Sequence, residues 1–205
     1  MKTVGITGGV GAGKSEVLKL IKEMTDCVIV TADELAKSLE KKGEVCYEPL
    51  IELLGMSITG PGGEIDSKKM ASVIFSDGNE DMLAAVDSII HPAVKHRILD
   101  MIDDERKKGT AKYFFIEAAL LIEDGYDKIV DELWYIYADE SVRRERLRSS
   151  RGYSDERIDG IIRSQGSDRV FREHCSIIID NSKSLDDTAR QLRKIFAGEK
   201  PDDIQ

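Results

Sequence analysis

The sequence has few cysteines and no long apolar run, and both features exclude classes of protein. Its 205 residues include only three cysteines, Cys27, Cys46 and Cys175, without a CxxC or Cys/His pairing. They provide neither a disulfide framework nor a zinc site, so we expect a reduced, cytoplasmic setting. No stretch approaches the roughly 18 consecutive apolar residues of a membrane span. The residues after Lys2 also lack the long apolar region of a signal peptide, so we expect no membrane partner.

An excess of positive charge is missing as well. The chain has 39 acidic and 30 basic residues and a net charge of −9. This balance argues against a protein that binds nucleic acid through its overall charge. With 41% hydrophobic and 34% charged residues, the composition is that of an ordinary globular protein. We expect a single domain that acts on a small molecule, as a monomer or weak homo-oligomer.

Short apolar runs alternate with longer helical patterns along the chain. Five runs are rich in β-branched or aromatic residues: 3–7, 28–30, 113–116, 133–137 and 177–179. Their apolar residues are consecutive rather than alternating, which is typical of strands buried on both faces of a parallel sheet. Between them, residues such as Val17, Leu18 and Ile21 recur at helical spacing. We therefore predict an α/β fold of three layers, with a five-stranded parallel sheet between helices.

Two connections are long for simple crossovers and divide the chain into a core and two insertions. We expect a helical, substrate-binding insertion at about 34–112 and a helical lid at about 141–172. The core is then made of residues 1–33, 113–140 and 173–205. In an open α/β sheet, such insertions lie over the carboxyl ends of the strands, where ligands bind. The alternative is that both merely cover the edges of the sheet.

The expected lid has no lysine but is rich in arginine. Nine arginines against five acidic residues give residues 141–172 a net charge of +4, so the remainder of the chain carries −13. The arginines are Arg143, Arg144, Arg146, Arg148, Arg151, Arg157, Arg163, Arg169 and Arg172. Arginine makes planar, bidentate contacts with phosphate that lysine cannot make. We interpret the segment as a lid that binds phosphate groups.

The most specific motif is the segment Gly8–Ser15. It matches the phosphate-loop pattern GxxxxGK[ST] and lies between the first expected strand and a helix. Glycines allow backbone N–H groups to approach a polyphosphate, and the N-terminus of the following helix adds partial positive charge. Lys14 is expected to reach the β- and γ-phosphates and Ser15 to coordinate Mg²⁺. The expected ATP ligands in the loop are Gly9, Val10, Gly11, Ala12, Gly13, Lys14 and Ser15.

Two carboxylates at strand ends favour a kinase over a switch GTPase or an assembly ATPase. The [NT]KxD segment with which GTPases bind guanine does not occur in the sequence. Asp33 and Glu117 each follow an expected strand, and parallel strands end at the same edge of the sheet. One carboxylate can accept the proton of an attacking hydroxyl, and the other can hold magnesium through a water molecule. A helix N-cap is the alternative role for Asp33.

Taken in order, these motifs resemble those of the dephospho-coenzyme A kinase family over nearly the whole chain. The loop Ile6–Ser15 is followed by Thr31-Ala32-Asp33, which is similar to the family's Asp-Ala-Asp strand end. His91-Pro92 resembles the His-Pro pair that opens a long helix in the family. The later matches are Glu117–Glu123, Arg146-Leu147 with Arg151, Gln165, and Asp180-Asn181. The sequence departs from the usual family residues at Glu117, Ala119, Ile161 and Ser176.

The resemblance implies ATP-dependent phosphorylation of the ribose 3′-hydroxyl of dephospho-CoA, the last step of CoA biosynthesis, with Mg²⁺ as the metal. Asp33 falls on the family's catalytic base, beside Lys14 and Arg146 as further catalytic residues. Arg146, Arg151 and Asn181 are the ATP ligands implied outside the loop, and Glu117 is a second magnesium site residue. The implied substrate-binding residues are Asp33, His91, Pro92, Glu117, Leu121 and Glu123.

Other interpretations remain open at this point. A nucleoside or nucleotide kinase of the same architecture would phosphorylate free nucleosides or monophosphates. A nucleotide-dependent switch would instead use its arginine-rich segment to bind an acidic partner. From the residues alone, His91 is equally compatible with a core or capping histidine, and Glu123 with an exposed charge on a helix.

Overall fold

The chain divides into two compact units in the computed structural model. Unit 1 combines Met1–Ile29 with Gly109–Gln205, and unit 2 is Val30–Lys108. Unit 2 thus covers most of the segment that the sequence indicates as an insertion. The structure describes residues 1–76, 81–118, 121–122, 125–165 and 168–199.

A five-stranded parallel sheet confirms the predicted fold class. Its strands are adjacent in the order β2-β3-β1-β4-β5. β1 pairs in parallel with β3 and with β4, and β4 pairs in parallel with β5. The strands are β1 (Lys2–Thr7), β2 (Cys27–Thr31), β3 (Tyr113–Glu117), β4 (Glu132–Tyr137) and β5 (Ile177–Asp180). All five apolar runs therefore form strands, each within two residues of its predicted bounds.

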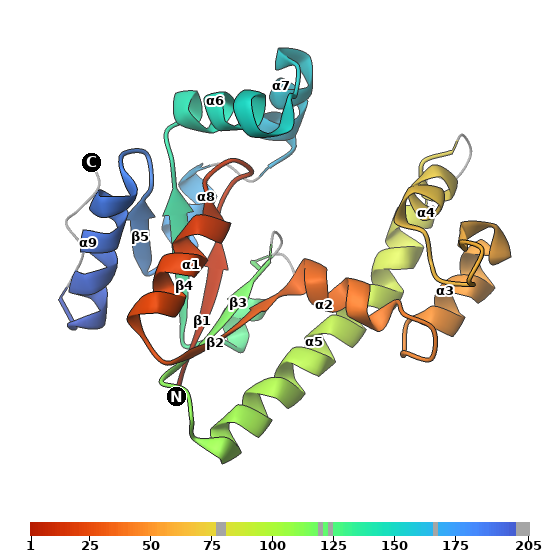
Figure 1. The fold of residues 1–205 in the computed structure, drawn as a ribbon, viewed down its shortest axis with the longest axis horizontal. Coiled ribbons are helices and arrows are strands. Elements are labelled where there is room, and N and C mark those ends of the chain that lie inside the picture. The colour runs from red at the N-terminus through yellow and green to blue at the C-terminus, as the bar shows by residue number, and fades with distance from the viewer. Residues whose placement is uncertain (77–80, 119–120, 123–124, 166–167, 200–205) are drawn as a thin grey trace. The chain divides into compact units, whose positions relative to one another are not determined.

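One face of the sheet packs against α1 (Lys14–Met24) and α9 (Leu185–Phe196) in a single apolar core (Figure 1). The predicted helical face of α1 is buried there, and so is Trp134 of β4. A capping box at Ser184 and Asp187 fixes the start of α9, since each side chain accepts a hydrogen bond from the other residue's backbone N–H. This core holds the end of β1 and the start of α1 in place, and the phosphate loop lies between them.

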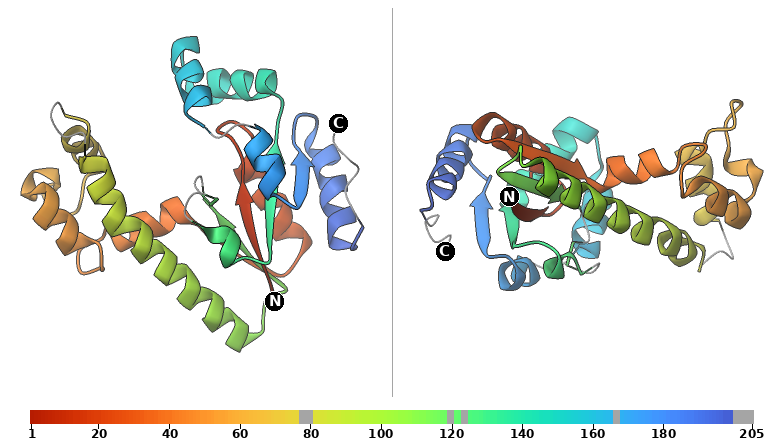
Figure 2. Two further views of the ribbon diagram at one scale, coloured as in Figure 1. Left: turned by 180° about the vertical axis from the view of Figure 1, so that it is seen from behind. Right: turned by 90° about the horizontal axis from the view of Figure 1, so that it is seen from below.

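The opposite face of the sheet in unit 1 carries the 3₁₀ helix η2 (Tyr126–Lys128) and α8 (Asp168–His174), as seen from behind in Figure 2. The rings of Tyr135 in β4 and Phe171 in α8 stack with centroids 4.9 Å apart. The expected three layers are therefore present. Between β4 and α8 the chain forms α6 (Glu140–Arg151) and α7 (Asp155–Ser164). Gly152 ends α6 in the left-handed conformation, and Ser154 caps α7 by accepting from Arg157 N.

Unit 2 is helical, as the sequence predicts for this part of the chain. After the end of β2, its elements are α2 (Ala32–Leu39), α3 (Tyr47–Leu54), the 3₁₀ helix η1 (Met56–Ile58), α4 (Ser67–Ile74) and α5 (Met82–Lys108). Asp66 caps α4 by accepting hydrogen bonds from Lys68 N and Lys69 N. No helix among the described residues is both long enough and apolar enough to cross a membrane.

The helix start expected at His91-Pro92 is wrong, and the alternative role of Asp33 as a helix cap is wrong too. The His91-Pro92 pair does not open a long helix, because α5 begins at Met82 and Pro92 lies inside it. Proline usually disrupts a helix interior, but α5 keeps an apolar stripe on both sides of it, in which Val86, Val94, Ile98 and Ile102 are buried. Asp33 is not an N-cap either, because Thr31 occupies that position and Asp33 lies in the first turn of α2.

Candidate active site

The phosphate loop begins where β1 ends at Thr7 and runs into the first turn of α1. Gly11 and Gly13 have φ angles of 83° and 87°, a left-handed conformation that only glycine adopts without strain. A Cβ atom on Gly13 would also lie 2.4 Å from the Asn181 Nδ2 atom. Ala12 N donates to Gly9 O at 3.0 Å and closes a tight turn. The glycines of the motif are thus needed for both conformation and close approach.

Lys14 and Glu117 lie together beside this loop. The Lys14 Nζ atom donates to Gly8 O at 2.8 Å and lies 3.5 Å from Glu117 Oε1. Glu117 is the last residue of β3, and β3 is adjacent to β1 in the sheet. The side chains of Lys14 and Glu117 retain 16% and 18% exposure, so both remain open to a ligand. Ser15 follows in the first turn of α1 and is exposed.

Arg146 and Asn181 hold the other side of the loop. Arg146 of α6 donates to Ala12 O at 3.2 Å and to Asn181 O at 2.8 Å. Asn181, which directly follows β5, donates from Nδ2 to Ala12 O at 2.8 Å and accepts from Thr188 Oγ1 at 2.9 Å. Asn181 is only 1% exposed, so its amide group serves to fix the loop to α9.

Arg143 and Gln165 form a further set of contacts with the loop, and our sequence-based list of site residues lacks both. Arg143 Nε donates to Val10 O at 3.0 Å, and Val10 N donates to Gln165 Oε1 at 3.2 Å. Arg143 Nη2 also donates to Gln165 Oε1. The one sequence signal for these residues is that Arg143 belongs to the arginine-rich segment and Gln165 to the family pattern. Neither signal indicates that they contact each other.

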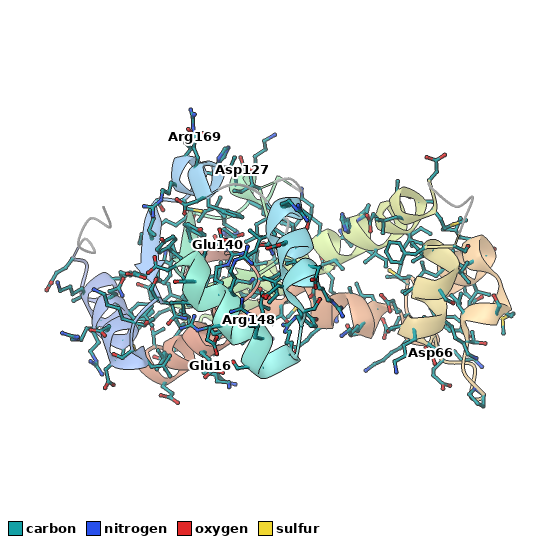
Figure 3. The ribbon with its side chains drawn as sticks, turned by 90° about the horizontal axis from the view of Figure 1, so that it is seen from above. Glu16, Asp66, Asp127, Glu140, Arg148 and Arg169 are labelled. Atoms are coloured by element: carbon teal, nitrogen blue, oxygen red, sulfur yellow. The ribbon has the colours of Figure 1, made fainter. Side chains whose placement is uncertain are left out.

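Most other arginines of the expected lid have partners away from the loop. Arg144, Arg148, Arg169 and Arg172 form ion pairs with Asp159, Asp155, Glu173 and Asp168, respectively. Arg157 and Arg151 lie 4.0 and 6.0 Å from the centroid of the Tyr153 ring. Figure 3 shows the Arg169 side chain pointing away from the body of unit 1. Of the nine arginines, the described contacts bring Arg143 and Arg146 to the phosphate loop.

A cluster around Tyr135 fixes α8 to β4. Tyr135 Oη donates to Asp168 Oδ1 at 3.0 Å, and Arg172 Nε donates to Asp168 Oδ2 at 2.6 Å. Burial and the hydrogen bond to Asp168 raise the pKa of Tyr135 far above its usual value. The hydrogen bond to Asp139 raises the pKa of Tyr137 to about 12. Both phenols are therefore neutral donors at physiological pH.

The other expected substrate-binding residues belong to α2, to α5 and to the segment that follows β3. Asp33 is exposed in the first turn of α2. His91 Nε2 lies 3.6 Å from Asp87 Oδ1 within α5, next to Pro92. Leu121 is fully buried in unit 1, where its side chain packs near Gly5 of β1. Glu123 lies outside the described residues.

Comparison with known proteins identifies the family. The model of the dephospho-CoA kinase family matches residues 2–187. A curated dephospho-CoA kinase from Dehalococcoides mccartyi is 35% identical over 188 residues, covering 91% of this chain and 92% of that protein. The chain belongs to the dephospho-CoA kinase family. A curated dephospho-CoA kinase from Aquifex aeolicus is 33% identical and covers 96% of each chain.

Solved structures agree with the fold. The crystal structure of TT1252 from Thermus thermophilus superposes with a TM-score of 0.77 at 27% identity, covering 96% of this chain and 97% of that one. Family membership confirms the predicted resemblance and the prediction of a P-loop kinase that transfers a phosphoryl group to a hydroxyl. It also supports ATP as the co-substrate, because this member of a kinase family carries the phosphate loop described above.

Proposed function

We propose that this dephospho-CoA kinase family member transfers the γ-phosphoryl group of ATP to the 3′-hydroxyl of the ribose of dephospho-CoA, giving CoA and ADP. The observation that carries the proposal is the phosphate loop with Lys14 and Glu117 beside it, in a chain whose family model is that of dephospho-CoA kinases. We further propose a cytoplasmic enzyme that acts without nucleic acid or membrane, as a monomer or weak homo-oligomer.

Lys14 supplies the positive charge at the transferring group. Its ammonium group is already held at the loop by Gly8 O, so it needs little reorganisation when the nucleotide binds. Negative charge builds up on the phosphoryl oxygens during transfer, and a fixed cation stabilises the transition state more than the ground state. The backbone N–H groups of Gly9, Gly11 and Gly13, with the start of α1, provide the remaining phosphate contacts, since Val10 N and Ala12 N already donate to oxygens of the protein.

Asp33 acts as the general base for the attacking 3′-hydroxyl. Its position in the first turn of α2, directly after β2, leaves the carboxylate exposed rather than used as a helix cap. An exposed carboxylate within reach of the acceptor can take the proton of an attacking hydroxyl. His91 and Pro92 of α5, together with Glu117 and Glu123, bind and orient dephospho-CoA. Leu121, expected from the sequence as a further contact, is fully buried beside Gly5 of β1 and presents no surface to the substrate.

The donors near the loop fit magnesium. Ser15 offers an exposed hydroxyl in the first turn of α1, and Glu117 offers a partly exposed carboxylate, which are the hard oxygen donors that Mg²⁺ prefers. Ser15 would hold the ion directly and Glu117 through water. When bound, Mg²⁺ neutralises phosphate charge and orients the β- and γ-phosphates. Lys14 limits how much negative charge Glu117 presents to the nucleotide.

Residues 141–172 serve as the lid that excludes water from the transfer. Arg146 contributes most directly, since its guanidinium already contacts the loop, and Arg151 is a further ATP ligand. Leu147 of α6 is buried and lies close to Gly11, which gives the lid an apolar contact with the loop. An open site would let water take the phosphoryl group in place of the ribose hydroxyl.

A panel of acceptors tests the proposal. ADP release is measured by a coupled assay with ATP, Mg²⁺ and, in turn, dephospho-CoA, adenosine, AMP or CMP. We expect rapid turnover with dephospho-CoA and only background ADP with the other three. Lys14→Met is the control: it should abolish phosphoryl transfer with every acceptor and so gives the background of ADP release. Faster turnover of AMP or CMP than of dephospho-CoA would favour a nucleotide kinase, and slow hydrolysis unaffected by any acceptor would favour a switch.

A further inference from the structure

Val10, Arg143 and Gln165 form a closed ring of three hydrogen bonds, which we name the Val10 clamp. Gln165 accepts from Val10 N, and Arg143 donates both to Val10 O and to Gln165. One residue of the phosphate loop is therefore held at its N–H and at its C=O by side chains from two different segments. Arg143 comes from α6, and Gln165 is the residue at which α7 ends.

The clamp fixes the Gln165 amide in one orientation. Two donors, Val10 N and Arg143 Nη2, point at the same side-chain atom, so this atom must be the carbonyl oxygen. The backbone of Gln165 is extended, with φ of −86° and ψ of 154°, which ends α7 at the residue that reaches the loop. The end of α7 is thereby tied to the phosphate loop.

The acceptors of Arg143 are both neutral oxygens, in contrast to those of its neighbours. Arg144 and Arg148 of the same helix pair with carboxylates, which cancel most of their charge. Among the described residues, Arg143 is instead held by a backbone carbonyl and an amide. Its guanidinium is thus fixed in place by neutral acceptors, which do not offset its charge as a carboxylate would.

The guanidinium group of Arg143 lies against the phosphate loop itself. A Cβ atom on Gly9 would lie 2.4 Å from Arg143 Nη2 and 2.5 Å from Cζ. The guanidinium therefore packs directly against Gly9, in the space that any larger residue would fill. A positive charge at this place favours binding of a polyphosphate to the loop.

We propose that Gln165 is a positioning residue for Arg143, and that the Val10 clamp presets a net positive charge on the phosphate loop for ATP. The inference rests on the proposed function in one respect, namely that the loop binds ATP. A glutamine suits this role better than a glutamate because it accepts the same hydrogen bonds without neutralising the arginine.

A double-mutant cycle on ATP affinity tests the proposal. The dissociation constant of Mg·ATP is measured by calorimetry for wild type, Arg143→Met, Gln165→Met and the double variant. We expect each single substitution to weaken binding by on the order of tenfold and the double variant to lose little more than Arg143→Met alone, because coupled residues are not additive. Gln191→Met is the matched control: Gln191 bridges α9 and Asp180 of β5, and its loss should leave ATP affinity unchanged.

Gln165→Glu separates positioning from a purely structural role. Glutamate retains both hydrogen bonds, so the melting temperature should stay at or above that of wild type. ATP affinity should nevertheless fall, because the new carboxylate cancels the charge of Arg143. Additive losses in the cycle, or wild-type ATP affinity in Gln165→Glu, would overturn the proposal. Turnover of dephospho-CoA by the wild-type chain, measured alongside, decides the proposed function separately, since ATP affinity does not depend on which acceptor is used.

Discussion

The Lys14 ammonium group lies between Gly8 O, 2.8 Å away, and Glu117 Oε1, 3.5 Å away. This pair connects the phosphate loop to the end of the adjacent strand β3. A lysine in this position is held by two oxygens before any phosphate arrives, and both oxygens can release it to a stronger anion. These two contacts therefore keep the lysine at the loop. They are weak enough for a triphosphate to replace them.

Replacing Lys14 should affect binding and rate together. Lys14→Met removes the charge but keeps much of the length of the side chain. We expect turnover to fall by about 10²–10³ and ATP affinity to decrease, because the charge contacts the nucleotide in both the ground state and the transition state. Steady-state kinetics with a parallel ATP titration measure both effects. A Lys14→Met variant with unchanged kcat would show that another residue neutralises the phosphoryl group.

Asp33→Asn, unlike Lys14→Met, should lower turnover without weakening ATP binding. Asparagine keeps the shape of the side chain but cannot take a proton, so turnover should drop by about 10²–10⁴. ATP affinity should change little, because the proposed role of Asp33 is toward the acceptor. The measurement is a single-turnover assay, in which chemistry limits the rate. If more than a tenth of the wild-type rate remains, Asp33 is not the base.

Substitution by lysine should lower activity to different extents at the two arginines of the family's lid pattern, Arg146 and Arg151. Arg146 donates to carbonyl oxygens of both the loop and Asn181, whereas Arg151 lies near the Tyr153 ring. A single ammonium group cannot reproduce a guanidinium fork that bridges two segments. We therefore expect Arg146→Lys to lower kcat/KM about tenfold or more, and Arg151→Lys to lower it less. A larger decrease for Arg151→Lys than for Arg146→Lys in the coupled assay would indicate that the main contact of the lid lies at the C-terminal end of α6.

The stability of the protein should fall at alkaline pH, in part because of Cys175. Burial raises the pKa of its thiol to about 12, whereas an unfolded cysteine ionises near its ordinary value of about 8.5. The folded state therefore binds this proton more tightly, and its contribution is intact below about pH 8.5 and is lost progressively up to pH 12. The decrease in unfolding free energy between pH 8 and pH 10.5, measured with urea, should be smaller in Cys175→Ala than in wild type. An equal decrease in both proteins would exclude this contribution.

Local patterns sufficed to predict the sheet and the phosphate loop. Strands buried on both faces need consecutive apolar residues, and a loop that wraps around phosphate needs glycine. Each can therefore be recognised from a few neighbouring residues of the sequence. The start of α5 was harder to predict, because the Pro92 signal suggested a helix start while packing of the apolar stripe extends the helix ten residues farther back, to Met82. Propensity is a local preference, and burial overrides it.

The contacts of the lid arginines depend on tertiary structure and could not be read from composition. By composition all nine arginines are equivalent donors, and the family pattern alone singles out Arg146 and Arg151. In the structure, carboxylates near Arg144, Arg148, Arg169 and Arg172 occupy four of them. The placement of α6 beside the loop adds Arg143, which no sequence pattern singles out, and brings Arg146 to the loop as well. Side chains that meet across more than 130 residues of sequence leave no local signal.

The most direct test of the central claim uses acceptors that differ by one hydroxyl group. The 2′-deoxy and 3′-deoxy analogues of dephospho-CoA are compared with dephospho-CoA itself in the ADP-release assay, with Lys14→Met as the background. If the chain phosphorylates the ribose 3′-hydroxyl, the 2′-deoxy analogue is phosphorylated and gains the mass of one phosphoryl group, and the 3′-deoxy analogue releases no ADP above background. Phosphorylation of the 3′-deoxy analogue at the rate seen with dephospho-CoA would contradict the account.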